Sequence, residues 1–129
     1  MPLYRCAIRE GLSSERQREQ IAKDIVRVHC GVTGAPPSFV HAFFQERPSS
    51  ELPDSQVAFV LGTIRWGRTD HQKAEIVSDL RDSIASALGC DRSEVGVVTV
   101  DIPSKWNMEG GSLLPEPGEE AAWLEAHRS

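Results

Sequence analysis

The groups best suited to chemistry in this sequence are a proline at position 2 and two arginines, Arg65 and Arg68, which flank Trp66-Gly67. If the start methionine is removed, Pro2 carries a free secondary amine, and an α-amine, with an ordinary pKa of about 7.7–8.0, can act as acid or base. Two guanidinium groups can grip and orient a carboxylate, because each presents a planar fork of donors. The alternative is structural: Pro2 only begins an edge strand, and the arginines are solvated surface charges.

Two further groups, His29 and Glu109, are candidates for activating water. His29 lies near the end of an expected helix, where the helix dipole favours its protonated form. Glu109 lies in the stretch MEGG, whose glycines allow the loop to fold over a cleft. A glutamate oriented by His29 can deprotonate a water molecule. The alternatives are a histidine bonded to the last helical carbonyls and a solvated loop glutamate. The other histidines are interpreted as strand, helix-start and tail residues without such a role: His41, His71 and His127.

These groups must be positioned by a pattern of strand, helix and strand that occurs twice. In the first unit, residues 2–45, alternation predicts a strand over 3–8, a helix from Ser14 to Gly31, and a strand over 38–45. In the second unit, residues 57–102, strands over 57–64 and 95–102 flank a helix that begins at Thr69-Asp70 and ends at Gly89.

The predicted fold is therefore α+β, with tandem β-α-β units in a single domain over residues 1–129. Because a helix connects the two strands of each unit, each pair is expected to be parallel, with both helices on one face of a four-stranded sheet. The other face needs cover, which oligomerisation would supply. Residues 103–129 are expected to form a structured loop and a short helix over 119–127, anchored by Trp123, with Trp106 and Leu114 closing a cleft or packing the loop.

Composition narrows the function classes. The net charge of −5 over 129 residues argues against a nucleic-acid partner, which needs a basic face. No signal peptide and no stretch of membrane-spanning length is visible, so a cytoplasmic protein without a membrane partner is expected. The three cysteines are widely spaced and form no C-x-x-C pattern, which predicts small buried thiols and neither a disulfide framework nor a zinc site.

Four stretches carry a resemblance to a known family. Pro2 is followed by the strand LYRCAI, residues 28–34 read VHCGVTG, residues 64–68 read IRWGR, and residues 102–118 read IPSKWNMEGGSLLPEPG. Together they resemble the tautomerase superfamily, most closely cis-3-chloroacrylic acid dehalogenase and its homologues. The resemblance implies a cofactor-independent homotrimer that acts on a small carboxylic acid. It implies catalytic roles for Pro2, His29 and Glu109 and substrate binding by Arg65 and Arg68.

One position departs from the dehalogenases, because Val98 stands where they carry an active-site tyrosine. Valine has no hydroxyl for a hydrogen bond, so we expect hydration or tautomerisation of 2-oxo or α,β-unsaturated acids, with weak dehalogenation of cis-3-chloroacrylate. A second alternative is a decarboxylase similar to malonate semialdehyde decarboxylase. It is disfavoured because residues 35–37 read APP and offer no aspartate after the first helix. A third is a non-catalytic α+β binding module.

Overall fold

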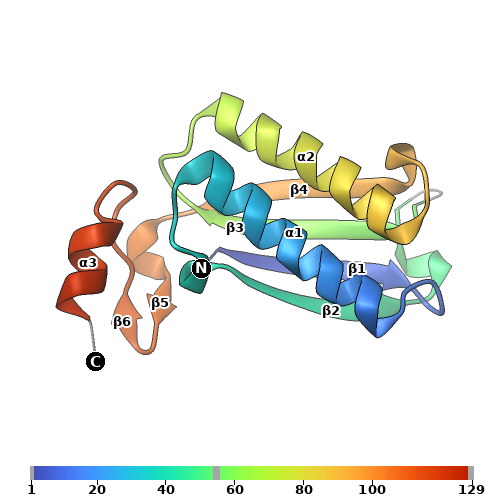
Figure 1. Ribbon diagram of the computed structural model, residues 1–129, viewed down its shortest axis with the longest axis horizontal. Helices are drawn as coiled ribbons and strands as arrows, with labels where there is room; N and C mark the ends of the chain where they lie inside the picture. Colours follow the sequence, from blue (N-terminus) through green and yellow to red (C-terminus); the bar gives the residue numbers. More distant parts are fainter. Residues whose placement is uncertain (1, 54–55, 128–129) are drawn as a thin grey trace.

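The computed structural model describes residues 2–53 and 56–127. The first unit consists of strand β1 (Leu3–Arg9), helix α1 (Glu15–Thr33) and strand β2 (His41–Arg47). The second consists of β3 (Ala58–Arg65), α2 (Asp70–Leu88) and β4 (Val95–Ile102). Strands β1 and β2 pair in parallel, as do β3 and β4, while β1 and β3 are antiparallel, which gives the order β2-β1-β3-β4. Both long helices cover one face (Figure 1), which confirms the predicted α+β arrangement.

The two units repeat their helix caps at one spacing. Ser14 and Thr69 are N-caps with complete capping boxes and stand 55 positions apart, and the left-handed C-caps Gly34 and Gly89 are also 55 apart. The prediction that the first helix ends at Gly31 is wrong. Gly31 lies inside α1, and the chain leaves the helix only at Gly34, whose φ of 76° is open to glycine at little cost.

The core lies between the sheet and the two helices. In β1, Tyr4, Cys6 and Ile8 alternate with more exposed residues and point toward the helices. Helix α1 meets them with a stripe spaced four and three residues apart, as the sequence predicted, and α2 contributes a similar stripe. The residues of these stripes are Ile21, Ile25, Val28, Ile76, Leu80 and Ile84.

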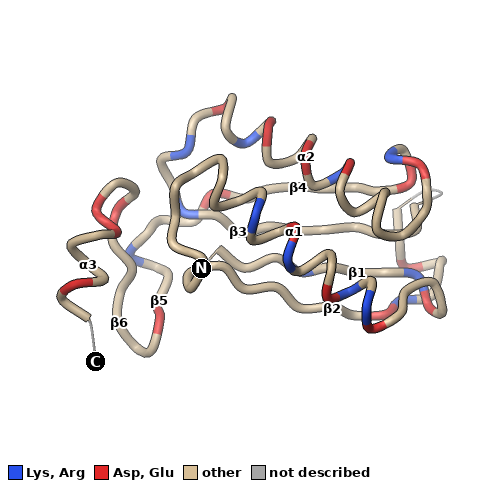
Figure 2. The backbone as a smooth tube through the Cα atoms, in the orientation of Figure 1, with Lys and Arg blue, Asp and Glu red and all other residues tan. Residues whose placement is uncertain are grey.

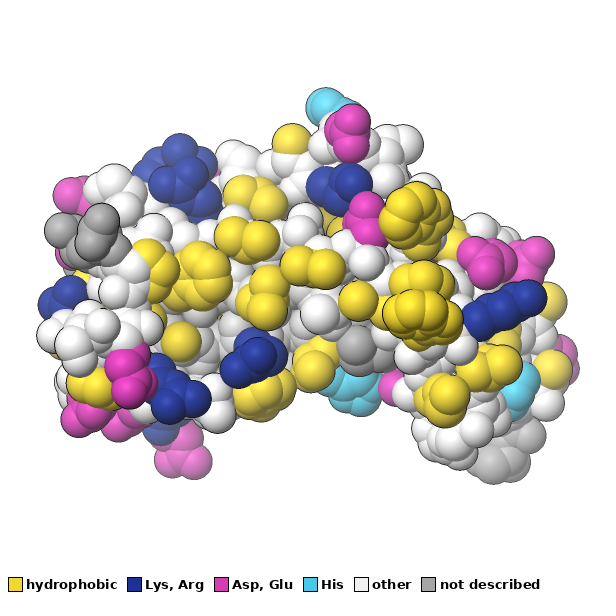
Figure 3. Space-filling view, turned by 180° about the vertical axis from the view of Figure 1, so that it is seen from behind, with side chains coloured by type: hydrophobic (Ala, Val, Ile, Leu, Met, Phe, Trp, Pro, Cys, Tyr) yellow, Lys and Arg dark blue, Asp and Glu magenta, His cyan; other side chains and the backbone are white. Residues whose placement is uncertain are grey.

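The opposite face of the sheet is left open within the chain. Large apolar side chains on β2 and β4 remain 38–44% exposed there, namely Phe43, Val98 and Val100. Seen from behind, hydrophobic side chains gather over this face (Figure 3). The expectation that a second surface must cover the sheet therefore rests on exposed apolar area of the kind that marks interfaces.

The remaining segments are short. The predicted second strand begins later than expected, because residues Pro37–Phe39 form a 3₁₀ turn before β2. Further single 3₁₀ turns occupy Ser49–Glu51, Arg92–Glu94 and Ser104–Trp106. The segment expected to be a structured loop without strands contains a small antiparallel hairpin, β5 (Met108–Glu109) and β6 (Ser112–Leu113), followed by α3 (Glu120–Ala126). These elements lie beyond one end of the sheet (Figure 1).

Trp123 anchors α3 as expected. Its ring nitrogen Nε1 donates to the Leu113 carbonyl at 2.7 Å, and its ring meets the edge of Phe39 at 5.3 Å between centroids. The C-terminal segment is thus tied both to its own hairpin and to the turn that precedes β2.

The charged residues are mixed in sign along the chain, and the cysteines are free. Acidic and basic residues are interspersed along α1, α2 and the turns (Figure 2). Within the described residues, no helix is long and apolar enough to cross a bilayer. All three cysteines are free, but only Cys6 is buried; Cys30 and Cys90 are partly exposed, which corrects the expectation of three buried thiols.

Candidate active site

A buried pair of polar residues, Tyr4 and His29, lies where β1 begins and α1 approaches its end. The Tyr4 hydroxyl and Nδ1 of His29 share a hydrogen bond of 2.8 Å, with Tyr4 0% and His29 1% exposed. Gly62 lies opposite Tyr4 across β1 and β3, where a Cβ atom would come within 2.5 Å of the tyrosine ring. The glycine therefore makes room for the ring that reaches His29.

His29 is held neutral by its surroundings. Burial lowers the pKa of the His29 imidazole to about 3, and the positive charges of Arg68 and Arg65 add to that effect. The expectation that the helix dipole favours the protonated form is therefore wrong. Desolvation and two cations outweigh a dipole effect that is worth at most about 2 kcal/mol in favourable geometries.

Arg65 is the last residue of β3 and is almost completely buried, with 1% of the residue exposed. Its Nη1 donates to the Pro115 carbonyl at 2.8 Å, and its Nη2 donates to Oε1 of Glu120, also at 2.8 Å. The guanidinium carbon lies 5.4 Å from the centre of the Phe39 ring. Arg65 is thus not a solvated surface charge: it ties the C-terminal segment to the end of the sheet.

Arg68 follows a tight turn at Gly67, where φ is 108°. Its side chain is 6% exposed, its Nη1 donates to the Thr33 carbonyl at 3.3 Å, and its Nη2 lies 3.5 Å from Oε1 of Glu120. Nε and Nη2 are buried and make no hydrogen bond within the described residues. Burial lowers the pKa of the Arg68 guanidinium, as does the charge of Arg65, while Glu120 opposes the shift. Two nitrogen atoms of Arg68, Nε and Nη2, therefore remain without a hydrogen bond. They lie close to the second positive charge, that of Arg65.

Glu120, the first residue of α3, is the internal counterion of this pair. Burial raises the pKa of its carboxyl, but hydrogen bonds from Arg65 and from the backbone N–H groups of Glu120 and Gly118 outweigh burial, so the pKa lies below its usual value. Two guanidinium groups thus share one carboxylate beside a neutral imidazole. The electrostatic balance of the cluster favours a further anion.

The structure pairs Glu109 with a different histidine from the one expected. Oε1 and Oε2 of Glu109 lie 2.7 and 3.1 Å from Nε2 of His41, at the start of β2. No hydrogen bond or ion pair joins Glu109 to His29, although both lie in the described part of the chain. The expected contact between His29 and Glu109 is therefore not seen. His41 lies in a strand as predicted, but it contacts Glu109, which the sequence did not indicate.

Pro2 is buried immediately before β1. Its carbonyl accepts a hydrogen bond of 2.9 Å from the backbone N–H of His41. Alternation along β1 places Pro2 on the same face of the sheet as Tyr4. The proline therefore stands at the end of the sheet where Tyr4, His29 and the arginines meet.

Three residues of this site were missed from the sequence: Tyr4, His41 and Glu120. The two buried arginines are the signal that could have pointed to Glu120, because buried cations need a counterion, but the partner's position follows only from the fold. Leu114 is buried and packs the C-terminal segment, whereas Trp106 is 77% exposed.

Val98 points away from this cluster. It is 44% exposed on the open face of the sheet, in register with Leu61, while its neighbour Val97 faces the helices. Within one chain, position 98 therefore does not contact the group around His29.

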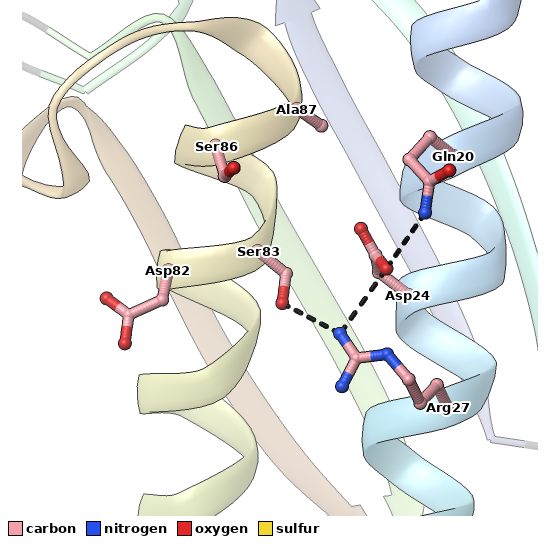
Figure 4. Close-up of a pocket in the computed structure, with 7 residues that line it drawn as sticks. All are labelled: Gln20, Asp24, Arg27, Asp82, Ser83, Ser86 and Ala87. Atoms are coloured by element: carbon pink, nitrogen blue, oxygen red, sulfur yellow. Dashed lines mark hydrogen bonds and ion pairs between the residues drawn. The ribbon is translucent and has the colours of Figure 1, made fainter.

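Among the hollows lined by described residues, two that lie outside this group are of interest. One, of roughly 500 Å³, is lined by aromatic, polar and charged residues: Trp66, Pro103, Ser104, Lys105, Trp106 and Glu116. The other is a groove between α1 and α2 in which Arg27 contacts Asp24 at 3.3 Å and Ser83 at 3.1 Å (Figure 4). Arg27 makes both contacts through Nη2, and its side chain is 64% exposed. No group of three or more potential metal ligands occurs among the described residues.

Comparisons with solved structures agree with the geometry. The crystal structure of N1, a member of the cis-3-chloroacrylic acid dehalogenase family, is 28% identical, with a TM-score of 0.88 over 96% of this chain and 91% of that one. Ps01740 is 38% identical, with a TM-score of 0.76 over 84% and 100%. A fused 4-OT described as a symmetric trimer is 25% identical, with a TM-score of 0.77 over 88% and 95%. No family model and no curated protein matches the sequence.

The repeated β-α-β fold and these similarities define the class: the chain belongs to the tautomerase superfamily. Within it, the chain is similar to N1, the cis-3-chloroacrylic acid dehalogenase family member, over nearly its whole length.

Proposed function

We propose that this protein is a cofactor-independent enzyme that transfers a proton through Pro2 on a small 2-oxo or α,β-unsaturated carboxylic acid. The observation that carries the proposal is the pair of buried side chains Arg65 and Arg68, for which Glu120 is the one counterion among residues 2–53 and 56–127. A substrate carboxylate would supply the second negative charge. Nε and Nη2 of Arg68 are the donors left to bind it.

The two arginines differ in their proposed roles. Arg65 uses Nη1 and Nη2 on Pro115 and Glu120, so it contributes charge and holds the C-terminal segment in place. Among the described residues, Arg68 makes one hydrogen bond, to Thr33, and one ion pair, from Nη2 to Glu120, while Nε and Nη2 make no hydrogen bond. Substrate capture is therefore assigned mainly to Arg68.

The proposed hydration uses three groups. Glu109 accepts a proton from water, and the water oxygen forms a bond to the β carbon of the unsaturated acid. The α carbon takes a proton from the ammonium form of Pro2, so that one water molecule is added in all. His29, neutral at ordinary pH, serves by hydrogen bonding rather than as a cation. In tautomerisation, the free amine of Pro2 removes a proton from the substrate and returns it to another atom.

We also propose that the protein assembles as a homotrimer through the open face of its sheet. The exposed Phe43, Val98 and Val100 support an interface there, as does the similarity to a fused 4-OT that is a symmetric trimer. In such an assembly, Val98 would lie against a neighbouring copy. The protein is proposed to act in the cytoplasm.

The test compares three assays: ketonisation of phenylenolpyruvate, hydration of an acetylenic acid, and turnover of cis-3-chloroacrylate. The wild type is expected to catalyse at least one of the first two, and Pro2→Ala is expected to abolish the activity while the fold, measured by circular dichroism, stays intact. Mass spectrometry of the purified protein should show that Met1 is removed. Full activity in the proline variant, or a mature chain that retains Met1, contradicts the proposal. Ligand binding without turnover would favour a binding module.

A further inference from the structure

One residue, His41, contacts both the N-terminal proline and the glutamate of the C-terminal hairpin. Its backbone N–H donates to the Pro2 carbonyl at 2.9 Å. Its ring atom Nε2 lies 2.7 Å from Oε1 and 3.1 Å from Oε2 of Glu109. Two groups that are far apart in sequence are thus brought to one point of the sheet, at the first residue of β2.

The hairpin that carries Glu109 has little rigidity of its own. Strands β5 and β6 contain two residues each, and the turn between them is Gly110-Gly111, with φ of 57° and 85°. Two-stranded hairpins are at best marginally stable in water. The direction of the Glu109 side chain therefore depends on contacts from outside the hairpin, and the hydrogen bond to Nε2 of His41 is one of them.

The pair adds little to stability. The side chains of His41 and Glu109 are 50% and 23% exposed, and partly exposed pairs of this kind contribute little to the free energy of folding because water screens the charges. Its geometry is more informative than its energy, because the ring can donate to a carboxylate only from the tautomer or ionised form that carries a proton on Nε2. A carboxylate has about four lone-pair sites, so a hydrogen bond from His41 can orient it and still leave it able to accept a proton.

We propose that His41 is a positioning residue that orients the Glu109 carboxylate as the base and places it relative to Pro2. This inference rests on the proposed function, because it assigns His41 to the step in which Glu109 takes a proton from water. His41 itself does not contact the substrate. It acts through the Nε2 hydrogen bond on one side and through the β1–β2 pairing on the other.

The chain allows a matched set of variants. In His41→Gln, the amide nitrogen stands close to where Nε2 was, so the donor to Glu109 is kept. In His41→Asn, the shorter side chain places its nitrogen near the position of Nδ1 and cannot reach. His41→Ala removes the ring, and all three keep the backbone hydrogen bond to Pro2. His71→Ala, an exposed histidine at the start of α2, is the control.

The readout is steady-state kinetics for hydration of an acetylenic acid. His41→Ala and His41→Asn are expected to lower kcat by about tenfold or more with little change in KM, because a misdirected base slows chemistry rather than binding. His41→Gln should recover activity to within about threefold, and His71→Ala should equal the wild type. Glu109→Gln should lower kcat by roughly 100-fold or more, and adding His41→Ala to it should cost nothing further.

Several outcomes would overturn the inference. Equal activity in all His41 variants, or a loss from His41→Ala that repeats in full in the Glu109→Gln background, would show that His41 does not act through Glu109. A rise in KM with kcat unchanged in the His41 variants would show that His41 affects substrate binding and does not orient the base. Full activity in Glu109→Gln, or no wild-type turnover, would instead contradict the proposed function. Independently of turnover, ¹⁵N NMR should show a proton on Nε2 of His41 and a changed Nε2 signal in Glu109→Gln; an unchanged signal contradicts the pairing.

Discussion

Arg65 donates through Nη2 to Oε1 of Glu120 at 2.8 Å, in a place where 1% of the arginine side chain and 13% of the glutamate side chain are exposed. A carboxylate from the chain itself therefore occupies part of the cationic site. Because Arg68 lies 3.5 Å from the same oxygen, the cluster holds two positive charges and one negative charge. This imbalance is the physical basis on which we propose that the site binds a carboxylic acid.

Glu120→Gln should destabilise the protein by about 2 kcal/mol, because it leaves buried guanidinium charge without a counterion while it keeps a polar side chain. Urea unfolding measures this loss. Addition of a small carboxylic acid should restore more stability to the variant than to the wild type. The matched control is Glu119→Gln, at an exposed neighbouring position, which should change stability by less than about 0.5 kcal/mol. Equal stability of the two variants would contradict the role of Glu120.

Acid should destabilise the fold through His29. Its pKa is about 3 in the folded protein and 6.5 in a model peptide, so between these values the unfolded chain binds the proton more readily. Stability should therefore fall as pH drops from about 6.5 toward 3, by up to about 1.4 kcal/mol per pH unit from this residue.

The variant that isolates this effect is His29→Asn, which keeps a polar atom near Nδ1 for Tyr4 but does not titrate. Urea unfolding at several pH values between 4 and 6 should give a shallower slope for the variant than for the wild type. Parallel slopes would show that His29 is not held neutral.

Gly62→Ala should displace the Tyr4 ring, because the new Cβ atom would lie 2.5 Å from Cε1 of the tyrosine. We expect a loss of about 1–3 kcal/mol of unfolding free energy and a reduced kcat, since the Tyr4 hydroxyl would no longer meet His29. Gly31→Ala is the control, because it lies in α1 with nothing within 4 Å of its added Cβ. That change should be neutral or stabilising by up to about 1 kcal/mol. The prediction is contradicted if Gly62→Ala and the wild type have the same midpoint of urea unfolding.

Val98→Glu should disrupt the proposed trimer, because a carboxylate would be buried unpaired in the interface. Sedimentation velocity should show a trimer for the wild type and monomers for the variant. Leu12→Glu, at an exposed position of the turn before α1, should leave the assembly intact. A wild-type protein that sediments as a monomer at micromolar concentration would contradict the proposed trimer interface.

Most of the fold could be predicted from patterns of residues that are close in sequence. The alternation around Tyr4, Cys6 and Ile8 and the capping boxes at Ser14 and Thr69 are set by residues close in sequence, so they could be recognised without coordinates. The end of α1 was misplaced because Gly31 and Gly34 look alike as stop signals. Only the backbone shows which of them takes the left-handed conformation.

The site was harder to predict because its partners are distant in the chain. The family resemblance pointed to the residues now found at one end of the sheet, but not to their pairings. Glu109 meets His41 across 68 positions, and Arg65 meets Glu120 across 55. Which residues pair in this way depends on the path of the C-terminal segment past the end of the sheet. The sequence of residues 103–118 has no periodic pattern from which that path could be predicted. Helix position alone also misjudged His29, because burial and cations override the helix dipole.

The central claim is that Arg68 binds the carboxylate of the substrate. The most direct test is to measure KM and kcat for phenylenolpyruvate ketonisation in Arg68→Ala. The control is Arg27→Ala, since the Arg27 guanidinium lies in the groove between the two long helices. Binding of the substrate carboxylate by Arg68 predicts a KM at least about tenfold higher in Arg68→Ala, with Arg27→Ala unchanged. Wild-type KM and kcat in Arg68→Ala would contradict it.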